Sequence, residues 1–456
     1  MTESSTSSSH TFQRRLKNRH IQLIALGGSV GTGLFLGTAH TISLAGPSIL
    51  LGYAIAGVIA FLIMRQLAEM VVEQPVAGSF SHFAHRYWGP FAGFAAGWNY
   101  WVLYILVSMA ELTAVGKYMQ YWWPELPSWI SVTACFVIIN AINFRHVKLF
   151  GEMEFLFSLI KIIAIVAMMV FGLYLLISGT GGPQASWSNL WAVGGFFPHG
   201  VSGLLLGLAI IMFSFGGLEL VGIAAAEADD PTRTIPRATN QVIIRILIFF
   251  IGSQAVLLAL FPWNQIAQGG SPFVMIFAAL HSPWIATALN IVVLIAALSV
   301  YNSATYSTSR MLTGLARQGD APHFLGRLNA KGVPVNSLCV SALASAVCVL
   351  INYLMPDRAF EVLLMLVTAS LTLNWLFISI THLKFHHAMQ RGRHSTRFPS
   401  PLQPWTNYLC LAFLCGILVI MACSEEMRLA VWLLPPWLVV LGVAYRLRAR
   451  GASAQG

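Results

Sequence analysis

The chain has 456 residues, of which 57% are hydrophobic and only 9% are charged. Soluble globular domains carry about 25% charged residues, so this composition excludes an ordinary soluble protein and predicts an integral membrane protein. The formal net charge of +10 does not indicate nucleic-acid binding, because the basic residues lie in short gaps between apolar runs.

Twelve apolar runs predict an all-α membrane protein with twelve transmembrane helices. Each approaches the roughly 20 mostly apolar residues that a helix needs to cross a bilayer. In chain order, the predicted spans are Ile21–Leu44, Pro47–Met64, Pro90–Gly116, Trp129–Phe144, Met153–Ser178, Ser202–Ala226, Gln241–Pro262, Trp284–Ser309, Val335–Met355, Phe360–Thr381, Trp405–Cys423 and Leu429–Tyr445.

The chain is predicted to form one membrane domain with short tails. We expect residues 1–20 to be an N-terminal tail, 21–447 the transmembrane domain and 448–456 a C-terminal tail. The first apolar run is too long for the apolar part of a signal peptide, so we interpret it as a retained span.

Basic residues fall in alternate gaps between the predicted spans, which predicts the orientation. Because cytoplasmic loops of membrane proteins are enriched in Lys and Arg, both termini are expected in the cytoplasm. The basic gaps hold Arg14 to Arg19, Arg65 with Arg86, Arg145 with Lys148, Arg233 with Arg237, Arg310 to Lys331, Lys384 to Arg397, and Arg446 to Arg450, whereas the other gaps hold little beyond Lys117, Arg358 and Arg428.

The gap from Glu69 to Trp88 mixes apolar and polar residues and is expected to lie along the inner membrane face. The six cysteines all fall inside apolar runs, and none forms a CxxC pair. We therefore interpret them as small buried hydrophobic residues and not as disulfides or metal ligands.

Two predicted spans are interrupted by glycine. The first reads Gly27-Gly28-Ser29-Val30-Gly31-Thr32-Gly33 and the sixth reads Phe213-Ser214-Phe215-Gly216-Gly217-Leu218-Glu219. An unwound helix in a bilayer needs protein or a polar cavity to satisfy its backbone groups, and such pairs of broken spans indicate a midplane substrate site. The alternative is that these glycines only allow close helix packing.

The broken segments suit a zwitterionic substrate such as an amino acid. The N–H groups at the start of a half-helix near Gly31, Thr32 and Gly33 can hold a carboxylate. The carbonyl groups around Ser29, Phe213 and Gly216 can accept hydrogen bonds from an ammonium group.

Three ionisable residues, Glu111, Lys161 and Glu219, lie well inside predicted spans, where a charge costs about 2.5–3.5 kcal/mol. We interpret them as candidates for proton coupling, because a buried lysine can lose its proton near neutral pH. For Lys161 the alternative is a structural pair with Glu154. Glu219 can instead brace the broken sixth span, and Glu111 can face either a cavity or a neighbouring helix.

The side chain of the substrate is expected to lie among Tyr104, Phe213, Phe215 and Ser303. The alternative for Tyr104 is core packing, since aromatic side chains usually pack. His382, His386 and His387 have the i, i+4 spacing of zinc ligands, but the surrounding Lys and Arg residues argue against a cation. We therefore predict no metal and no cofactor, and the absence of hydrolase, P-loop and HExxH motifs predicts that the protein is not an enzyme.

Five stretches of the chain resemble the amino acid permeases of the amino acid–polyamine–organocation superfamily. They are LKNRHIQLIALGGSVGTGLFLG (Leu16–Gly37), FLIMRQLAEMVVEQPVAGSFSHFAHRYWG (Phe61–Gly89), GWNYWVLYILVSMAELTAVGKY (Gly97–Tyr118), IIMFSFGGLELVGIAAAEADDP (Ile210–Pro231) and ALSVYNSATYSTSRMLTGLARQG (Ala297–Gly319). Within that family the chain is most similar to bacterial permeases for aromatic amino acids.

The resemblance implies a five-plus-five inverted repeat with discontinuous helices 1 and 6, two added helices, and import of Phe, Tyr and Trp by proton symport across the bacterial inner membrane. Gly31, Thr32 and Gly33 match the carboxylate-binding turn of the family, and Phe213 and Gly216 match residues that gate the substrate and bind its amine. Lys161 matches a lysine that takes the place of a sodium ion in some members. The partners expected are therefore an amino acid, protons and membrane lipid, without nucleic acid.

Other functions remain open from the sequence. A permease for proline, GABA or phenylalanine alone shares much of this pattern, and an exchanger would ignore a proton gradient. A sensor that resembles a permease would bind an amino acid without moving it.

Overall fold

The computed structural model describes residues 30–76, 78–144, 147–225, 230–266, 271–274, 283–329, 331–356 and 358–453. Every regular element in these ranges is helical, as the apolar runs predict. The first part of the chain forms α2 (Thr32–Phe35), α3 (Gly37–Ala45), η1 (Gly46–Ser48), α4 (Ile49–Glu73), α5 (Phe80–Tyr87), α6 (Pro90–Met119), α7 (Ser128–Asn143), α8 (Val147–Ser178), η2 (Trp187–Leu190), α9 (Gly200–Ser214) and α10 (Leu220–Ala224).

The second part contains further helices, including the π-helical segment η4, which joins α12 to α13. Its elements are α11 (Pro231–Asn240), α12 (Val242–Arg245), η4 (Ile246–Gly252), α13 (Ser253–Leu260), η5 (Trp263–Gln265), α15 (Pro283–Arg317), η6 (His323–Gly326), α16 (Val335–Leu354), α17 (Ala359–Arg391), α18 (Trp405–Cys423), α19 (Arg428–Trp432) and α20 (Leu434–Ser453).

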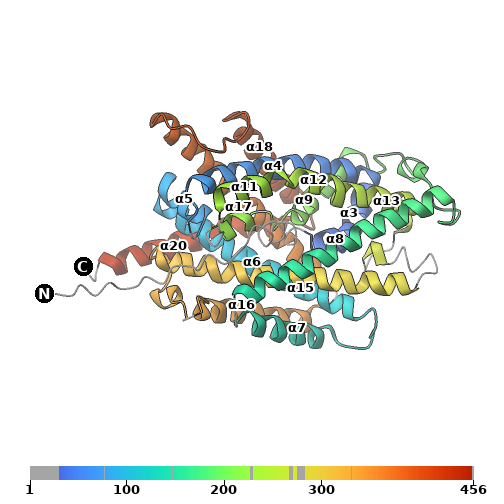
Figure 1. Cartoon of the computed structure of the whole chain (residues 1–456), viewed down its shortest axis with the longest axis horizontal. Coiled ribbons are helices and arrows are strands. Elements are labelled where there is room, and N and C mark those ends of the chain that lie inside the picture. The colour runs from blue at the N-terminus through green and yellow to red at the C-terminus, as the bar shows by residue number, and fades with distance from the viewer. Residues whose placement is uncertain are drawn as a thin grey trace.

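Most of the long helices run along one common direction and form a bundle (Figure 1). In the described part of the chain, nine helical segments are long and apolar enough to cross a membrane, and α7 and α9 are shorter apolar helices. Each predicted span from the second to the twelfth overlaps one of these segments. Residues 21–29 of the first predicted span lie outside the described residues, so the count of twelve stays a prediction.

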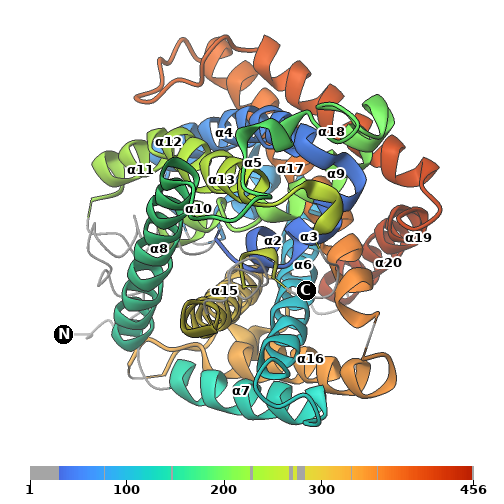
Figure 2. The same ribbon diagram turned by 90° about the vertical axis from the view of Figure 1, so that its right-hand side faces the viewer.

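The inner helices of the bundle are α6 and α17, and the outer ones include α8, α18 and α20. The most apolar stretch of α6 is 78% buried, whereas that of α20 is only 11% buried. α6 packs extensively against both α15 and α17. Figure 2 shows α6 and α15 within a ring of other helices, with α18 on the outside. Residues on α6, α15 and α17 are therefore placed to line an interior site.

The inner connector predicted from Glu69 to Trp88 begins later than expected, because α4 continues to Glu73. The prediction failed because a hydropathy pattern ends at a charged residue, whereas the helix continues if that charge is satisfied. The buried carboxylate of Glu69 accepts hydrogen bonds from Thr396 Oγ1 at 2.6 Å and the Ser400 backbone N–H at 2.7 Å, and it lies 2.9 Å from His382 Nε2.

Three of the cysteines are also placed differently from the prediction. Cys348 and Cys410 are buried, but Cys339, Cys415 and Cys423 are exposed on the surface of the bundle. An apolar run in a membrane helix includes a face toward lipid as well as a face toward protein, so position in such a run does not decide burial.

Close contacts between α3 and α9 depend on glycine, which supplies a test of the packing. A β-carbon added at Gly203 would clash with the backbone oxygen of Leu44 and lie 2.7 Å from His199 Cβ, whereas one added at Gly416 meets no atom within 4 Å.

We predict that Gly203→Ala lowers the free energy of unfolding by about 1–3 kcal/mol, because a backbone oxygen cannot move aside as a side chain can. Thermal unfolding of the purified protein in detergent measures this change. Gly416→Ala is the matched control and should leave the melting temperature unchanged or raise it slightly. Equal melting temperatures for the two variants would contradict the packing described here.

Candidate functional site

The helical path between α9 and α10 is broken at residues 215–219. Two tight turns follow the end of α9: the Phe215 N–H donates to Met212 O at 3.1 Å, and the Gly216 N–H donates to Phe213 O at 3.1 Å. Gly217 has φ +102°, a conformation that favours glycine. The helix is thus interrupted where the sequence has glycine, and the short helix α10 begins directly after the break.

The start of α2 lies directly against the end of α9, next to this break, and against α15. Gly31 has extended backbone (φ −129°, ψ −154°), and the helix begins at Thr32. A β-carbon added at Gly33 would lie 2.8 Å from Ser214 Cα, and one added at Gly31 would lie 2.7 Å from Val300 Cγ2. Both positions therefore require glycine because other elements approach the backbone closely. Ser29, a predicted site residue, lies outside the described residues.

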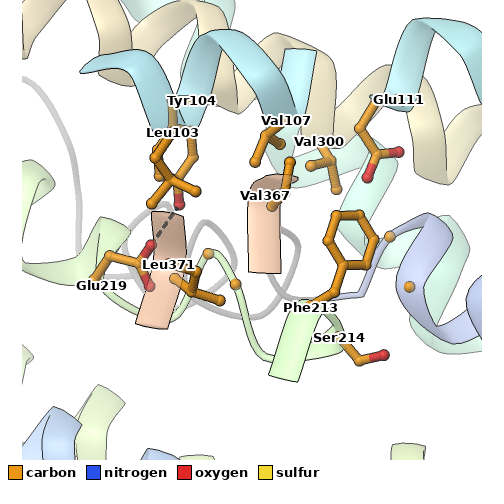
Figure 3. A pocket seen from close by; sticks show the side chains of 14 residues that line it. Leu103, Tyr104, Val107, Glu111, Phe213, Ser214, Glu219, Val300, Val367 and Leu371 are labelled. Atoms are coloured by element: carbon orange, nitrogen blue, oxygen red, sulfur yellow. Dashed lines mark hydrogen bonds between the residues drawn. The ribbon is translucent and has the colours of Figure 1, made fainter. Parts of the chain in front are cut away.

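A small cavity of about 20 Å³ lies between the start of α2, the 215–219 break, α6, α15 and α17. Figure 3 shows Glu111 and Phe213 toward one end of it and the pair of Tyr104 and Glu219 toward the other. The cavity brings together these predicted site residues: Gly31, Gly33, Tyr104, Glu111, Phe213, Gly216 and Glu219.

Glu111 on α6 contacts the first residue of α2. The Thr32 hydroxyl donates to Glu111 Oε1 at 2.9 Å, and the Thr32 backbone also hydrogen bonds this carboxylate. The second oxygen, Oε2, has no hydrogen-bond partner among the described residues. A buried carboxylate that lines a cavity with one unpaired oxygen is placed to accept a proton or a ligand.

Lys161 on α8 contacts the residue that precedes α2 on its N-terminal side. Its ammonium group donates to Val30 O at 3.1 Å and to Ser299 Oγ at 2.9 Å. The Ser299 hydroxyl in turn donates to Glu154 Oε1 at 2.6 Å, so Ser299 bridges Lys161 and Glu154. Lys161 lies outside the cavity lining, but it and Glu111 hold the same short stretch of backbone, residues 30–32.

The other end of the cavity is closed by the Tyr104 hydroxyl, which donates to Glu219 Oε1 at 3.0 Å. Tyr104 and Glu219 come from α6 and from the residue before α10, so this hydrogen bond ties the inner helix to the broken segment. Both side chains are buried, at 2% and 0% exposure.

Two predicted members of the side-chain pocket lie elsewhere. Phe215 points away from the cavity, and its ring packs against Phe250 at a centroid distance of 5.0 Å and against Tyr53 at 6.0 Å. Ser303 is buried on α15 but does not line the cavity. Residues two apart on a helix point in directions about 200° apart, which explains why Phe213 reaches the cavity and Phe215 does not.

The histidines on α17 are also separated. His382 Nε2 lies 2.9 Å from Glu69 Oε2 and its Nδ1 faces Asn407, whereas His386 contacts Gln390. Within the described ranges no group of His, Cys, Asp and Glu has the arrangement of a metal site.

The sequence reasoning missed the aliphatic wall of the cavity. Apolar side chains from α6, α15 and α17 complete the lining, namely Leu103, Val107, Val300, Val367 and Leu371. A single Val or Leu inside an apolar run carries no signal, and only the packing of the three helices shows which of them face inward.

Comparison with known proteins gives a consistent result. Residues 20–455 match the family described as "Amino acid permease". The chain is 63% identical to the aromatic amino acid transport protein AroP of Escherichia coli K12 over 97% of both chains, and 62% identical to the protein of that name from Salmonella typhimurium LT2 over 97% of this chain and 96% of the other. An uncharacterized amino acid permease of Bacillus subtilis, YtnA, is 43% identical over 95% of this chain and 94% of its own length.

Among solved structures, a manganese transporter of Eremococcus coleocola, in complex with an aromatic bis-isothiourea compound, has a similar fold. Its TM-score is 0.61 at 15% identity, over 95% of this chain and 94% of the other. At this low identity the likeness concerns the fold alone.

The contact between Thr32 and Glu111 can be tested by stability. We predict that Thr32→Val lowers the free energy of unfolding by about 1–3 kcal/mol, because the substitution keeps the shape but removes a donor from a buried carboxylate. The midpoint of thermal unfolding in detergent reports the change.

Thr133→Val is the control, because the Thr133 hydroxyl bonds only to Trp129 O, one turn earlier on its own helix. We expect its melting temperature to stay within the error of the wild type. A Thr32→Val protein as stable as this control would show that the hydrogen bond to Glu111 contributes nothing.

Proposed function

The chain belongs to the amino acid permease family, and on that premise we propose that it imports aromatic amino acids across the bacterial inner membrane by proton symport. The observation that carries the proposal is the convergence of two helix breaks, a buried carboxylate and an aliphatic wall on one cavity. The choice of aromatic substrates is supported by the name of the relatives that share 62–63% of the sequence.

We infer that the fold has twelve spans in a five-plus-five inverted repeat, with helices 1 and 6 discontinuous and both termini cytoplasmic. The support lies in the paired interruptions: α2 is separated from α3 at Leu36, α9 is separated from α10, and the two broken segments meet where Gly33 faces Ser214. In transporters built from such repeats, the substrate site lies where the broken helices meet, near the middle of the bilayer. The domain limits proposed are a tail at 1–20, the membrane domain at 21–447 and a tail at 448–456.

In the proposed complex, the substrate carboxylate binds the backbone N–H groups of Thr32 and Gly33, and its ammonium group binds carbonyl oxygens near Ser29, Phe213 and Gly216. The Phe213 carbonyl already accepts the Gly216 N–H, and a carbonyl oxygen has a second lone pair with which it can accept from the substrate. The ring of the substrate packs against the aliphatic wall that α6 and α17 supply.

The cavity must widen before an amino acid can enter. Ligand sites usually have volumes of about 300–1,000 Å³, whereas this cavity measures about 20 Å³. Phe213 fills the space between Gly33 and the cavity, with its Cδ1 2.9 Å from a β-carbon placed at Gly33. We infer that the Phe213 side chain moves away from the cavity to admit the substrate and then closes over the bound substrate. This is the behaviour of a gate.

Proton coupling is proposed to occur through Glu111 and Lys161. Glu111 already binds the Thr32 hydroxyl and the Thr32 backbone, and the Thr32 backbone N–H is one of the groups proposed for the substrate carboxylate. Two carboxylates at one buried position repel each other, so arrival of the substrate favours the protonated form of Glu111. Lys161 holds the same backbone through Val30 O, and loss of its proton would weaken that contact by removing the charge on the donor. Glu219 is a third candidate, and its hydrogen bond to Tyr104 equally supports a bracing role.

Coupling of this kind requires that substrate and proton bind better together than apart, in at least one of the two access states. An exchanger or a permease for proline or GABA would use the same backbone groups, so transport measurements must separate them.

We predict that the purified protein in proteoliposomes accumulates labelled phenylalanine when an inward proton gradient is imposed. With one proton per substrate and no membrane potential, each pH unit supports an accumulation of about tenfold, because one pH unit is worth 1.36 kcal/mol. A protonophore should abolish the accumulation. Unlabelled tyrosine and tryptophan should compete with phenylalanine, whereas proline and GABA should not.

Uptake that requires amino acid inside the vesicles and ignores the gradient would overturn symport and indicate exchange. Competition by proline or GABA as strong as that by tyrosine would overturn aromatic selectivity.

A further inference from the structure

A second, larger cavity lies apart from the transport site. It has a volume of about 480 Å³ and opens between α6, the loop that follows α15, and α20. Its lining shares no residue with the cavity at the helix breaks. α20 packs on α6 at one end of the bundle (Figure 1), and the two charged residues of this groove, Asp320 and Arg448, lie beyond α15 and near the end of α20.

The walls of the groove are apolar. Phe94 and Trp98 of α6 form one wall, and Trp437, Val440 and Ala444 of α20 form the other. Val440 is 55% exposed, so this wall is open to the lipid that surrounds a membrane protein.

The closed end of the groove is charged. The Asp320 carboxylate is 3% exposed and forms an ion pair with Arg448 through Oδ1. The Trp98 indole N–H donates to the Asp320 backbone oxygen at 3.1 Å, which fixes the position of this residue. Burial raises the pKa of Asp320, while the charges of Arg448 and His85 lower it. Within the described part of the chain, Asp320 Oδ2 has no hydrogen-bond partner.

The groove therefore ends in two groups that suit a zwitterion. Asp320 offers an unpaired carboxylate oxygen for a positive charge, and the Arg448 side chain, which is 36% exposed, offers a guanidinium group for a negative charge. A buried unpaired acceptor costs free energy unless a ligand supplies a donor. A phospholipid with an ethanolamine headgroup carries an ammonium donor, a phosphate for the arginine, and acyl chains for the apolar walls. A choline headgroup has no N–H donor, and a glycerol headgroup has no positive charge.

We propose that this groove binds a phospholipid with a primary-amine headgroup, whose ammonium group donates to Asp320 Oδ2 while its phosphate contacts Arg448. One acyl chain lies along Trp437, Val440 and Ala444. The bound lipid thereby joins α20 to the loop after α15 at the membrane surface.

The test is lipid retention by the purified full chain, measured by native mass spectrometry. The probes are phosphatidylethanolamine, phosphatidylcholine and phosphatidylglycerol with identical acyl chains. We expect phosphatidylethanolamine to bind about tenfold more tightly than phosphatidylcholine, because hydrogen bonds between charged groups are the strong ones. Asp320→Asn should lower this preference to the level of phosphatidylcholine, and Glu125→Gln, a change at an exposed carboxylate, should preserve it.

A second variant keeps the proposal testable if Asp320→Asn folds poorly. Ala444 is exposed in the groove, so Ala444→Trp fills the space and leaves both charges in place. We expect it to lose retention of phosphatidylethanolamine. Equal retention of the ethanolamine and choline lipids by the wild type, or an unchanged preference in both variants, would overturn the proposal. A stable dimer that covers the groove and excludes all three lipids would also overturn it. None of these readouts requires transport, so they are independent of the proposed function.

Discussion

The backbone at the start of α2 is held from two sides by ionisable side chains, and the candidate site depends on this arrangement. Glu111 binds Thr32, and Lys161 binds the carbonyl oxygen of Val30. In a low-dielectric interior, the loss or gain of one proton on either group changes these contacts by much more than it would in water. The charges are also placed within electrostatic reach of each other. A substrate carboxylate that docks on the same backbone cannot bind without affecting both.

The glycines make this arrangement possible. At Gly31 and Gly33 the chain passes so close to α15 and to the end of α9 that no side chain fits. The backbone itself therefore lines the cavity and can offer its polar groups to a ligand. Phe213 covers this backbone in the present conformation, so the small cavity is consistent with a transporter whose site is closed until the gate moves. Tyr104 and Glu219 tie the opposite end to the inner helix α6.

The sequence predicted the helical architecture and the position of the break in the sixth span, because glycine in an apolar run is a strong and local signal. It also selected Glu111 and Glu219, since a charge inside a span is conspicuous. It could not tell that Phe213 faces the cavity while Phe215 packs in the core, because both are phenylalanines in the same broken segment.

Long-range packing explains the remaining differences. Glu69 was predicted to lie in a connector because its charge ended the apolar pattern. Its carboxylate is instead buried and paired with Thr396, Ser400 and His382, which are more than 300 residues away in the sequence. The aliphatic wall at Val367 and Leu371 has no local signal at all, because every turn of α17 carries similar residues. The hydrogen bonds from Lys161 to Val30 O and Ser299 Oγ likewise join three separate parts of the chain.

Of the groups proposed for proton coupling, Glu111 is the one that contacts both the cavity and the backbone proposed for the substrate, so its role can be tested most directly. The most direct measurement compares gradient-driven accumulation of phenylalanine with phenylalanine exchange in proteoliposomes that contain Glu111→Gln, using Glu125→Gln as the control. We expect that the neutral side chain still permits binding and exchange, whereas accumulation driven by the proton gradient is lost. Accumulation equal to that of the wild type would contradict this expectation, and so would a complete loss of phenylalanine binding.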